Sequence, residues 1–573
     1  MPIHNKDIAK IFKLVADYLE VEGSNIYRVR AYRNAARTID DYSKSLESMI
    51  KNKENLQNIP GIGEDLENKI KTIVNKKTLP MLEKLKSKIP INLEKLLKIE
   101  GLGPKKIKKL YENLDIKNIQ ELQTAIRTNK IREIKGFGKK TEQNLKEALS
   151  RINEQKDRMK YADAEVIAKS LINYLKNKSK IKQIEICGSY RRGKETVGDL
   201  DILSVTADKK STMETFVNYE DVEKILSKGE TKSSVIIKQN FQVDLRLVDT
   251  ESYGSALIYF TGSKSHNVVI RKLAIKKNYK INEYGVYANN NRVAGKTEKE
   301  IYNKIDLNFI EPELRENNGE IEAAKNDNLP QLIETKDIKG DLHFHTKETD
   351  GKYTLKEMAK QAEKMGYEYI GNTEHSQNLS VAKGLDEKRL SKQIEKIEKI
   401  NKQLKSIKIL KSIEVDILED GSLDLSDDIL KKLDYTICSV HSKLKMSKKE
   451  MTQRILRAMD NPYFTILGHP TGRLINKRKP YDLDMAKIMR KAKDKNLILE
   501  LVSNPKRLDL NAKHCKMAKD FGVKISISTD SHTKNSFYNI KYGIKQARRG
   551  WLEKDDVINT LDLEHLNKYF NNK

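Results

Sequence analysis

The chain has few cysteines and no long apolar run. Its 573 residues include three cysteines, Cys187, Cys438 and Cys515, whose spacing fits neither a disulfide framework nor a thiolate zinc site. Residues 1–10 lack the apolar core of a signal peptide, and no stretch approaches the ~18 apolar residues needed to cross a bilayer. These absences argue against a secreted or membrane protein, so we expect a soluble protein of the reducing cytoplasm.

Acidic residues are outnumbered by basic ones. The 110 Lys and Arg against 82 Asp and Glu leave a formal net charge of +28, which attracts polyanions such as nucleic acid. A Lys-, Asn- and Ile-rich composition that reflects an A·T-rich genome is the alternative explanation. At roughly 100 to 200 residues per domain, the length predicts three to five domains and allows several functions.

The first part of the chain repeats one short sequence pattern within a region predicted to be helical. Apolar residues recur every three or four positions over residues 7–86, which predicts amphipathic helices. The pattern apolar-x-Gly-apolar-Gly then places glycines at Gly61 and Gly63, at Gly101 and Gly103, and at Gly136 and Gly138. Each copy leads into a predicted helix and leaves N–H groups open to a phosphate oxygen. A single Gly-x-Gly is usually an ordinary turn, but three copies followed by Lys105 and Lys139 resemble helix-hairpin-helix motifs that bind the DNA backbone.

Short β-rich runs begin near residue 180, and two of them carry carboxylates. Asp199 and Asp201 open the run 200–205, so their side chains share one face of a strand. Asp244, in a second alternating run, can supply a third oxygen ligand. Divalent cations such as Mg²⁺ bind such oxygens and keep positions open for phosphate and water. An isolated Asp-x-Asp is usually a solvated strand end, so the surrounding residues decide its meaning.

A glycine-containing motif upstream of these carboxylates favours their interpretation as a metal site over a solvated strand end. Residues 188–193 read Gly-Ser-Tyr-Arg-Arg-Gly. Glycine lets the backbone approach a triphosphate, Ser189 can donate to a phosphate oxygen, and Arg192 can bind one with its planar guanidinium. The combination predicts a nucleotidyl-transfer site.

These phrases resemble the family X DNA polymerases of the nucleotidyltransferase superfamily, across roughly residues 1–315. Further matches are residues 198–201, 243–246, 259–263 and 281–284. The resemblance implies a palm whose catalytic Asp199, Asp201 and Asp244 hold two Mg²⁺ or Mn²⁺ ions, followed by a nucleotide-selecting thumb. The nucleotide contacts it implies are Gly188, Ser189, Arg192, Gly198, Tyr259, Phe260, Gly262, Asn267 and Arg271.

The chain departs from this family at some positions. Gln242 stands where many relatives place an arginine, and Lys264 where some place an aspartate, which leaves fidelity and metal preference open. The N-terminal segment resembles the family's deoxyribose-phosphate lyase domain, with Lys69 at the position of the Schiff-base nucleophile. That role needs a partly neutral amine, whereas Asp65, one turn away, favours the charged form. A phosphate-binding lysine is the alternative.

After a polar stretch at residues 311–337, apolar runs separated by helical patterns end in metal-binding side chains. Six of the ten histidines lie at such ends, and the run 497–502 ends without a ligand. About seven βα units forming a barrel, with ligands at one end, account for this pattern. Mixed imidazole and carboxylate ligands suit Zn²⁺, Mn²⁺ or Fe²⁺.

This second region, residues 337–573, resembles the polymerase-and-histidinol-phosphatase (PHP) domain. The resemblance implies phosphoester hydrolysis at up to three metal ions. Glu374 replaces the aspartate usual before the motif's histidine. The positions that match the family's nine metal ligands are His343, His345, Asp350, His375, Glu414, His441, His469, Asp530 and His532.

Together these patterns predict a multidomain α+β and α/β chain that repairs DNA. We expect a helical lyase-like domain at 1–86, helix-hairpin-helix fingers at 87–155, a palm at 156–255, a thumb at 256–315, a linker at 316–336 and a distorted (β/α)7 PHP barrel at 337–573. The expected activity is gap filling in base excision repair, coupled to a 3′–5′ exonuclease, with apurinic-site cleavage also possible in the barrel. The expected partners are gapped double-stranded DNA and deoxynucleoside triphosphates, and the protein is expected to be a monomer at the nucleoid of a prokaryote.

Two rival functions remain at this stage. One is a small-molecule phosphatase, such as a histidinol-phosphate hydrolase, tethered to a DNA-binding region. The other is a non-catalytic clamp that holds broken DNA ends. The complete set of ligands at both sites argues against each.

Overall fold

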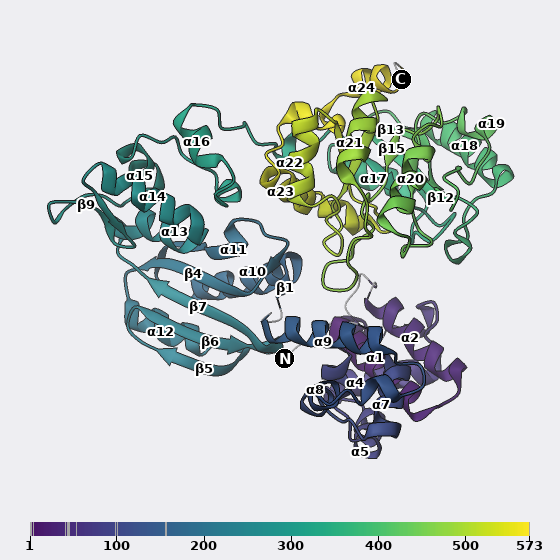
Figure 1. Cartoon of the computed structure of the whole chain (residues 1–573), viewed down its shortest axis with the longest axis horizontal. Coiled ribbons are helices and arrows are strands. Elements are labelled where there is room, and N and C mark those ends of the chain that lie inside the picture. Colours follow the sequence, from purple (N-terminus) through teal and green to yellow (C-terminus); the bar gives the residue numbers. More distant parts are fainter. Residues whose placement is uncertain are drawn as a thin grey trace. The chain divides into compact units, whose positions relative to one another are not determined.

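The computed structural model describes residues 3, 5–40, 42, 46–52, 54–97, 99, 101–154 and 158–571. The chain divides into two compact units, residues 1–157 and 158–573 (Figure 1). Within the described ranges, no helix combines the length and the apolar character needed to span a membrane.

The first unit is helical, as the apolar spacing predicts. Ile8, Phe12, Val15 and Leu19 are buried along one side of α1, and the ring of Phe12 meets that of Tyr32 edge-on at 5.6 Å. A single core runs through the unit. Its helices are α1 (Asn5–Glu22), α2 (Ile26–Asp40), α3 (Leu46–Lys51), α4 (Glu64–Lys76), α5 (Pro80–Lys88), α6 (Leu93–Leu96), α7 (Pro104–Leu114), α8 (Ile119–Arg127) and α9 (Lys139–Glu154).

The second unit begins with a mixed five-stranded sheet. Its strands run in the order β2 (Ile181–Ile186), β4 (Asp199–Thr206), β7 (Phe241–Leu247), β6 (Lys232–Ile237) and β5 (Val222–Lys228). Strands β4 and β7 are parallel, and the other neighbouring pairs are antiparallel. Apolar side chains of α10 (Tyr161–Lys178) and α12 (Lys209–Val217) share a core with the sheet, while α13 (Tyr253–Thr261) packs in a separate cluster that includes Leu203 (Figure 1). The sheet is therefore covered on both faces.

The chain then forms a small α/β subdomain. It contains α13, α14 (Lys264–Lys276), α15 (Glu298–Lys304) and a three-stranded sheet of β8 (Lys280–Asn282), β9 (Gly285–Ala288) and β10 (Asn291–Ala294). The segment expected to be a linker, residues 316–336, contains α16 (Glu320–Lys325), and its Ile321 and Leu332 join the core of this subdomain. This segment is packed, because its apolar side chains have partners in that core.

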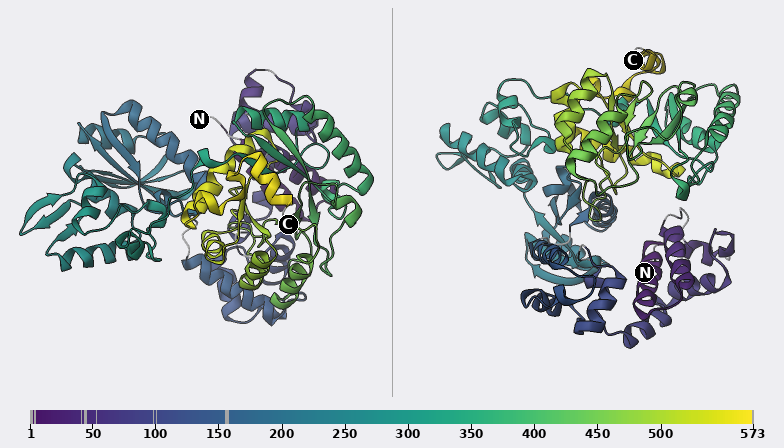
Figure 2. Two further views of the ribbon diagram at one scale, coloured as in Figure 1. Left: turned by 90° about the horizontal axis from the view of Figure 1, so that it is seen from above. Right: turned by 45° about the vertical axis from the view of Figure 1, so that its right-hand side comes forward.

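The last region is a seven-stranded parallel barrel, as predicted. Its strands pair in sequence order, and a bridge between Phe344 and Ser531 links the first to the last. Helices surround the strands (Figure 2), and Leu566 and Phe570 of α24 (Leu563–Asn571) pack against the amino ends of the strands. The strands are β11 (Gly340–Phe344), β12 (Tyr369–His375), β13 (Lys408–Asp416), β14 (Ile437–Ser439), β15 (Ile466–Leu467), β16 (Ile498–Val502) and β17 (Ile525–Ser528).

The helices that follow these strands give the alternating βα order. They are α17 (Leu355–Lys364), α18 (Glu387–Asn401), α19 (Asp427–Leu430), α20 (Lys448–Ala458), α21 (Met485–Asp494), α22 (Ala512–Phe521) and α23 (Ile540–Arg549). Because each parallel strand is covered by helices outside and side chains inside, its residues are buried almost throughout.

Candidate functional site

The three aspartates singled out from the sequence meet on the palm sheet. Asp199 and Asp201 lie two apart on β4, and Asp201 pairs directly with Asp244 on the parallel strand β7. Residues two apart on a strand share a face, so the register places all three carboxylates on one face of the sheet. Burial and, to a smaller extent, the negative charges of Asp199 and Asp244 together raise the pKa of Asp201 to about 6. Divalent cations bind carboxylate oxygens arranged in this way and neutralise their negative charge.

Gln242 takes part in this cluster through Asp244. Its Nε2 donates to Asp244 Oδ1 at 2.9 Å, and Lys232 Nζ of β6 lies 3.2 Å from Asp244 Oδ2. Lys232 therefore places a positive charge beside Asp244 from the neighbouring strand.

Residues 188–193, which include the short helix α11 (Gly188–Arg191), form a tight turn against Asp201, and this segment is called the Gly188 loop below. Gly188 has a φ of +62°, and a Cβ at this position would lie 2.9 Å from Asp201 Oδ2. The space and the backbone conformation both require glycine. Arg158 Nη2 lies 3.4 Å from Ser189 Oγ, and a Cβ on Gly198 would meet Arg158 Nη1 at 3.0 Å. Sequence reasoning missed Arg158, which stands outside any motif it used.

The loop is tied to the thumb by buried charges. Arg192 donates to the Thr261 carbonyl, and its Nε lies 3.0 Å from Glu316 Oε1. Arg191 binds both oxygens of Glu298, at 2.8 and 2.7 Å, and Arg315 Nη1 lies 2.6 Å from Glu298 Oε1. Burial raises the pKa of Glu298, but Arg315 and Arg191 outweigh it and hold the pKa at about 2. The carboxylate is therefore ionised and clamps the loop to the thumb.

The expected sugar and base contacts also lie together. Tyr259 and Phe260 end α13 with rings 5.0 Å apart, and Gly262, with a φ of +67°, caps the helix. Asn267 Nδ2 donates to the Tyr259 carbonyl at 2.8 Å, and Arg271 Nε donates to the Asn267 carbonyl at 3.3 Å. Lys264, in contrast, is exposed at the start of α14 and makes no hydrogen bond among those described.

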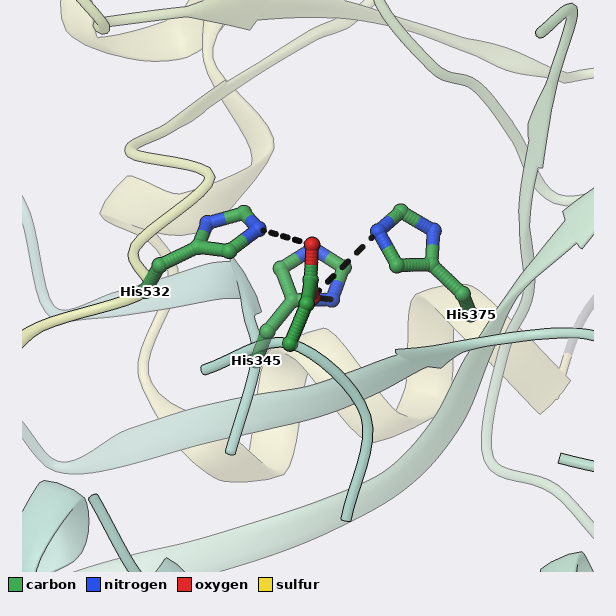
Figure 3. Close-up of side chains that lie close together, drawn as sticks. His345, His375 and His532 are labelled. Carbon is green, nitrogen blue, oxygen red and sulfur yellow. Dashed lines mark hydrogen bonds and ion pairs between the residues drawn. The ribbon is translucent and has the colours of Figure 1, made fainter. Parts of the chain in front are cut away.

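A second cluster lies at the carboxyl ends of the barrel strands. Its residues come together in three groups whose ligand atoms lie within 4.8 Å of one another: His345, Asp350, His375 and His532; His343, His345 and Asp530; and His375, Glu414 and His441. Rings of His345, His375 and His532 converge in Figure 3. Asp350 lies 3.2 Å from His532 Nε2 and 3.6 Å from His375 Nε2.

Glu414 is the centre of this cluster. Its carboxylate oxygens lie 2.9 to 3.6 Å from nitrogens of His343, His345, His375, His441 and His469. All nine positions predicted as ligands are therefore in one place, including His469, whose Nε2 is 2.9 Å from Glu414 Oε1.

The chemistry of these donors fits metal ions. The buried Nδ1 atoms of His345 and His469 have no hydrogen-bond partner in the described structure. Burial and the neighbouring His532 and His375 lower the pKa of His345 to about 3, whereas nearby carboxylates raise the pKa values of His375, His441 and His532 despite their burial. A metal ligand must be a neutral imidazole, so ions that bind here would displace protons from those three histidines. Buried imidazoles and carboxylates of this kind suit Zn²⁺, Mn²⁺ or Fe²⁺.

A surrounding layer of carboxylates orients the histidines. Glu500 Oε1 lies 2.6 Å from His343 Nδ1, and Asp416 binds His441 Nδ1. Glu374 accepts hydrogen bonds from the Thr346 N–H, at 3.1 Å, and from the hydroxyls of Thr346 and Thr349, so it holds the loop after β11. Sequence reasoning missed Glu500 and Asp416. A glutamate inside the apolar strand β16, and an aspartate two residues after Glu414, were the available signals.

The three glycine patterns adopt one geometry in the first unit. Gly61, Gly101 and Gly136 have φ values of +81°, +91° and +97°. The second glycine of each pattern immediately precedes α4, α7 or α9, and the first glycines are exposed. Lys105 and Lys139 are exposed at the first turns of α7 and α9. These are open helix N-termini of the kind that bind phosphate.

Lys69 borders a cavity of about 510 Å³ in the same unit, with Arg28, Tyr32, Gly63 and Asp65. Its Nζ is bonded to Asp65 and lies 5.2 Å from the centre of the Tyr32 ring. Burial lowers the pKa of Lys69, but the bonds to Asp65 and Tyr32 outweigh it and raise the pKa above its usual value. The amine is held in its charged form, as the adjacent aspartate led us to expect.

Four regions of the chain match known families. Residues 3–79 match the helix-hairpin-helix domain, 93–151 the SAM-like helix-hairpin-helix tandem, 256–316 the DNA polymerase beta thumb and 341–504 the PHP domain. The assignments agree with the helical unit, the subdomain after the palm and the barrel.

Similar proteins cover the whole chain or its barrel alone. The chain is 36% identical over 571 residues, 99% of both chains, to "DNA polymerase/3'-5' exonuclease PolX" of Bacillus subtilis (strain 168). It is 31% identical over 248 residues to a probable phosphatase of Thermoanaerobacter sp. (strain X514), covering 41% of this chain and 94% of that protein. A probable phosphatase of Clostridium novyi (strain NT) is 31% identical over 206 residues, 34% of this chain and 78% of that protein. The chain belongs to the family X DNA polymerases that carry a C-terminal PHP domain.

Proposed function

We propose that this chain fills short gaps in DNA at its palm and removes 3′-terminal nucleotides at its barrel. The observation that carries the proposal is the pairing of Asp201 with Asp244 beside the Gly188 loop, in a chain that also holds a complete ligand cluster around Glu414. Gapped double-stranded DNA and deoxynucleoside triphosphates are the substrates, and base excision repair is the setting.

At the palm, the protein positions two reacting groups. Asp199, Asp201 and Asp244 would hold two Mg²⁺ or Mn²⁺ ions, which stabilise the attacking and leaving oxygens. The primer 3′-hydroxyl attacks the α-phosphorus, a new phosphodiester bond forms, and pyrophosphate leaves. Ser189 and Arg192 bind the triphosphate, while Tyr259, Phe260 and Gly262 crowd the sugar against ribose. Asn267 and Arg271 approach the minor-groove edge of the new base pair.

At the barrel, the nine clustered residues would hold up to three Zn²⁺, Mn²⁺ or Fe²⁺ ions, which supply a nucleophile at neutral pH and neutralise charge on the phosphate. Glu500 and Asp416 fix the orientation of His343 and His441. The outcome is cleavage of a phosphodiester at the 3′ end. Apurinic-site cleavage is a second activity for the same centre.

A gapped duplex with a 5′-phosphate tests both activities in one reaction. With the four deoxynucleotides and Mg²⁺ or Mn²⁺, we expect extension to the end of the gap, and without nucleotides we expect shortening from the 3′ end. Absence of extension with either metal ion would overturn the polymerase assignment.

The barrel-only relatives are named as probable phosphatases, so the barrel's substrate needs its own comparison. Histidinol phosphate and a duplex with an apurinic site are therefore offered to the same protein. Turnover of histidinol phosphate with intact DNA would make the barrel a small-molecule phosphatase.

The N-terminal unit is proposed to hold the DNA backbone through its three hairpins, with Gly61, Gly63, Gly101, Gly103, Gly136 and Gly138 at the phosphates and Lys105 and Lys139 beside them. Lys69 is a weak lyase nucleophile at most, since Asp65 keeps it charged. We propose that the protein works as a monomer.

A further inference from the structure

A cavity of about 460 Å³ lies between the Gly188 loop of the palm and the barrel domain. The palm contributes residues that follow Gly188, and the barrel contributes residues of α22, α23 and the loop after β15. The lining side chains that matter here are Ser189, Arg192 and Lys194 from the palm, and Arg473, Lys513 and Arg549 from the barrel.

The barrel side of this cavity is anchored to the loop itself. Arg549 Nη1 donates to the Arg192 carbonyl at 2.7 Å, and Arg473 binds both carboxylate oxygens of Glu195, at 3.1 and 2.7 Å. A Cβ on Gly193 would lie 2.5 Å from Lys545 Cγ, so α23 packs directly on the loop. The cations from the barrel are therefore held at fixed positions beside Ser189 and Arg192.

Positive charge in this cavity exceeds negative charge. Six basic side chains line it against one carboxylate, Glu195. One further carboxylate, Glu316, lies 3.0 Å from Arg192 Nε and 3.2 Å from Arg549 Nη1 without lining the cavity. Six cations against two carboxylates leave an excess of four.

Two guanidinium groups have capacity left for a ligand. The side chains of Arg192, Arg473 and Arg549 are only 11%, 10% and 13% exposed. Arg473 Nε is buried without a hydrogen-bond partner in the described structure. Both hydrogen bonds that Arg549 makes in the described structure use Nη1, which leaves its Nε and Nη2 for another acceptor. Buried charge of one sign is costly unless an anion compensates it.

We propose that this cavity binds a polyphosphate, so that Lys513 and Arg549 of the PHP domain are nucleotide-binding residues of the polymerase. The inference rests on the proposed function, because Ser189 and Arg192 bind the triphosphate only if the palm is a polymerase. The ligand is either the triphosphate tail of the incoming nucleotide or the pyrophosphate released from it. Arginine side chains can bind both the triphosphate and pyrophosphate. Each ligand presents several phosphate oxygens, and the planar guanidinium group donates hydrogen bonds to such oxygens in a fixed geometry.

Lys513→Ala and Arg549→Ala, each in the full chain, test this inference. Lys513 is exposed and makes no bond between palm and barrel among those described, so its removal leaves the docking of α23 intact. Lys516→Ala, on the same helix but outside the cavity and paired with Asp520, is the matched control. We expect the KM for deoxynucleotide on gapped DNA to rise about 10-fold for Arg549→Ala and about 3-fold for Lys513→Ala, as loss of hydrogen bonds to a charged group implies. The kcat of Lys513→Ala, the exonuclease rates of both variants and all activities of the control variant should stay near wild type.

Calorimetric titration of tripolyphosphate and of pyrophosphate into each protein, with EDTA present, measures binding without catalysis. Weaker binding of both anions by the two variants supports the inference. Weaker binding of pyrophosphate alone, with an unchanged KM for nucleotide, also supports it and identifies the product as the ligand. Unchanged affinities together with unchanged KM values overturn it, as does a loss confined to affinity for gapped DNA. Failure of the wild-type protein to extend a primer would instead overturn the polymerase assignment, while the titration would still test the cavity.

Discussion

His343 and Glu500 form a buried pair at the barrel mouth, with His343 Nδ1 2.6 Å from Glu500 Oε1. The Glu500 carboxylate accepts a hydrogen bond from the Nδ1–H of His343. The other nitrogen, Nε2, therefore faces Glu414 and Asp530, at 3.5 and 3.8 Å. Outer partners of this kind fix the tautomer of a metal-binding histidine.

Glu500→Gln should therefore lower 3′-end degradation and metal content while leaving primer extension unchanged. Loss of such a partner typically costs about 10- to 100-fold in activity or affinity. Metal content by mass spectrometry and degradation of a labelled duplex measure the two effects, with Glu398→Gln on the outer face of α18 as the control. Equal degradation and equal metal content in both variants would show that Glu500 does not orient His343.

Gly188→Ala should strongly reduce polymerase activity and leave nuclease activity unchanged. The new methyl group would lie 2.9 Å from Asp201 Oδ2, and the backbone φ of +62° disfavours any residue with a Cβ. Displacing a catalytic carboxylate by about 1 Å is enough to cost roughly 100-fold in rate. Single-nucleotide insertion on gapped DNA gives the measurement. Gly319→Ala, where a Cβ meets open space at a similarly positive φ, separates backbone strain from the contact with Asp201. An insertion rate for Gly188→Ala within a few-fold of wild type would mean that the loop lies elsewhere during catalysis.

Glu298→Gln should destabilise the second unit because it leaves Arg191 and Arg315 buried without their counter-charge. Removing one partner from a buried ion pair costs about 3–5 kcal/mol. Thermal denaturation at neutral pH measures the loss. Glu251→Gln, at an exposed pair with Lys296, should change stability by less than about 1 kcal/mol.

The stability difference between wild type and Glu298→Gln should depend on pH. The folded pKa of Glu298 is about 2, below its ordinary value of 4.5, so its contribution is present above pH 4.5 and is lost as the pH falls toward 2. The difference in Tm between wild type and Glu298→Gln should therefore narrow on acidification from pH 5. A difference that stays constant from pH 7 to pH 3 would contradict the ionised clamp.

Asp65→Asn should increase reaction of Lys69 with an aldehyde at a deoxyribose-phosphate end. The carboxylate bonded to Lys69 Nζ raises the pKa of the amine, and its removal leaves burial to lower that pKa. Borohydride trapping of DNA adducts between pH 6.5 and 9 reports the neutral fraction, with Lys69→Ala as the blank. Trapping that is no greater in Asp65→Asn than in wild type would leave Lys69 as a phosphate-binding residue.

Much of both sites could be predicted because strand geometry places residues by simple rules. Asp199 and Asp201 share a face since they are two apart, and residues at the ends of parallel strands converge at one end of a barrel, which gathered His375 and Asp530. Alternation in the second run placed Asp244 on the same sheet face, and the structure adds that it pairs directly with Asp201.

What the sequence could not reveal depends on contacts between distant parts of the chain. Arg473 binds Glu195, which lies 278 positions away in the sequence, and Lys232 of β6 contacts Asp244 of β7. Glu500 looked like an ordinary strand residue because its partner His343 is 157 positions away. The segment 316–336 looked like a linker because it is polar and contains Gly319, Pro330 and several asparagines, although Ile321 and Leu332 pack in the thumb core.

The central claim is that one chain carries two separable active sites, and a single gapped 5′-phosphorylated duplex tests it. Wild type, Asp244→Ala, His343→Ala and the surface control His565→Ala are compared for extension with nucleotides and for 3′ degradation without them. We predict that Asp244→Ala loses extension and keeps degradation, that His343→Ala does the reverse, and that His565→Ala keeps both. Loss of both activities in either variant, or extension by Asp244→Ala at the wild-type rate, would contradict the claim.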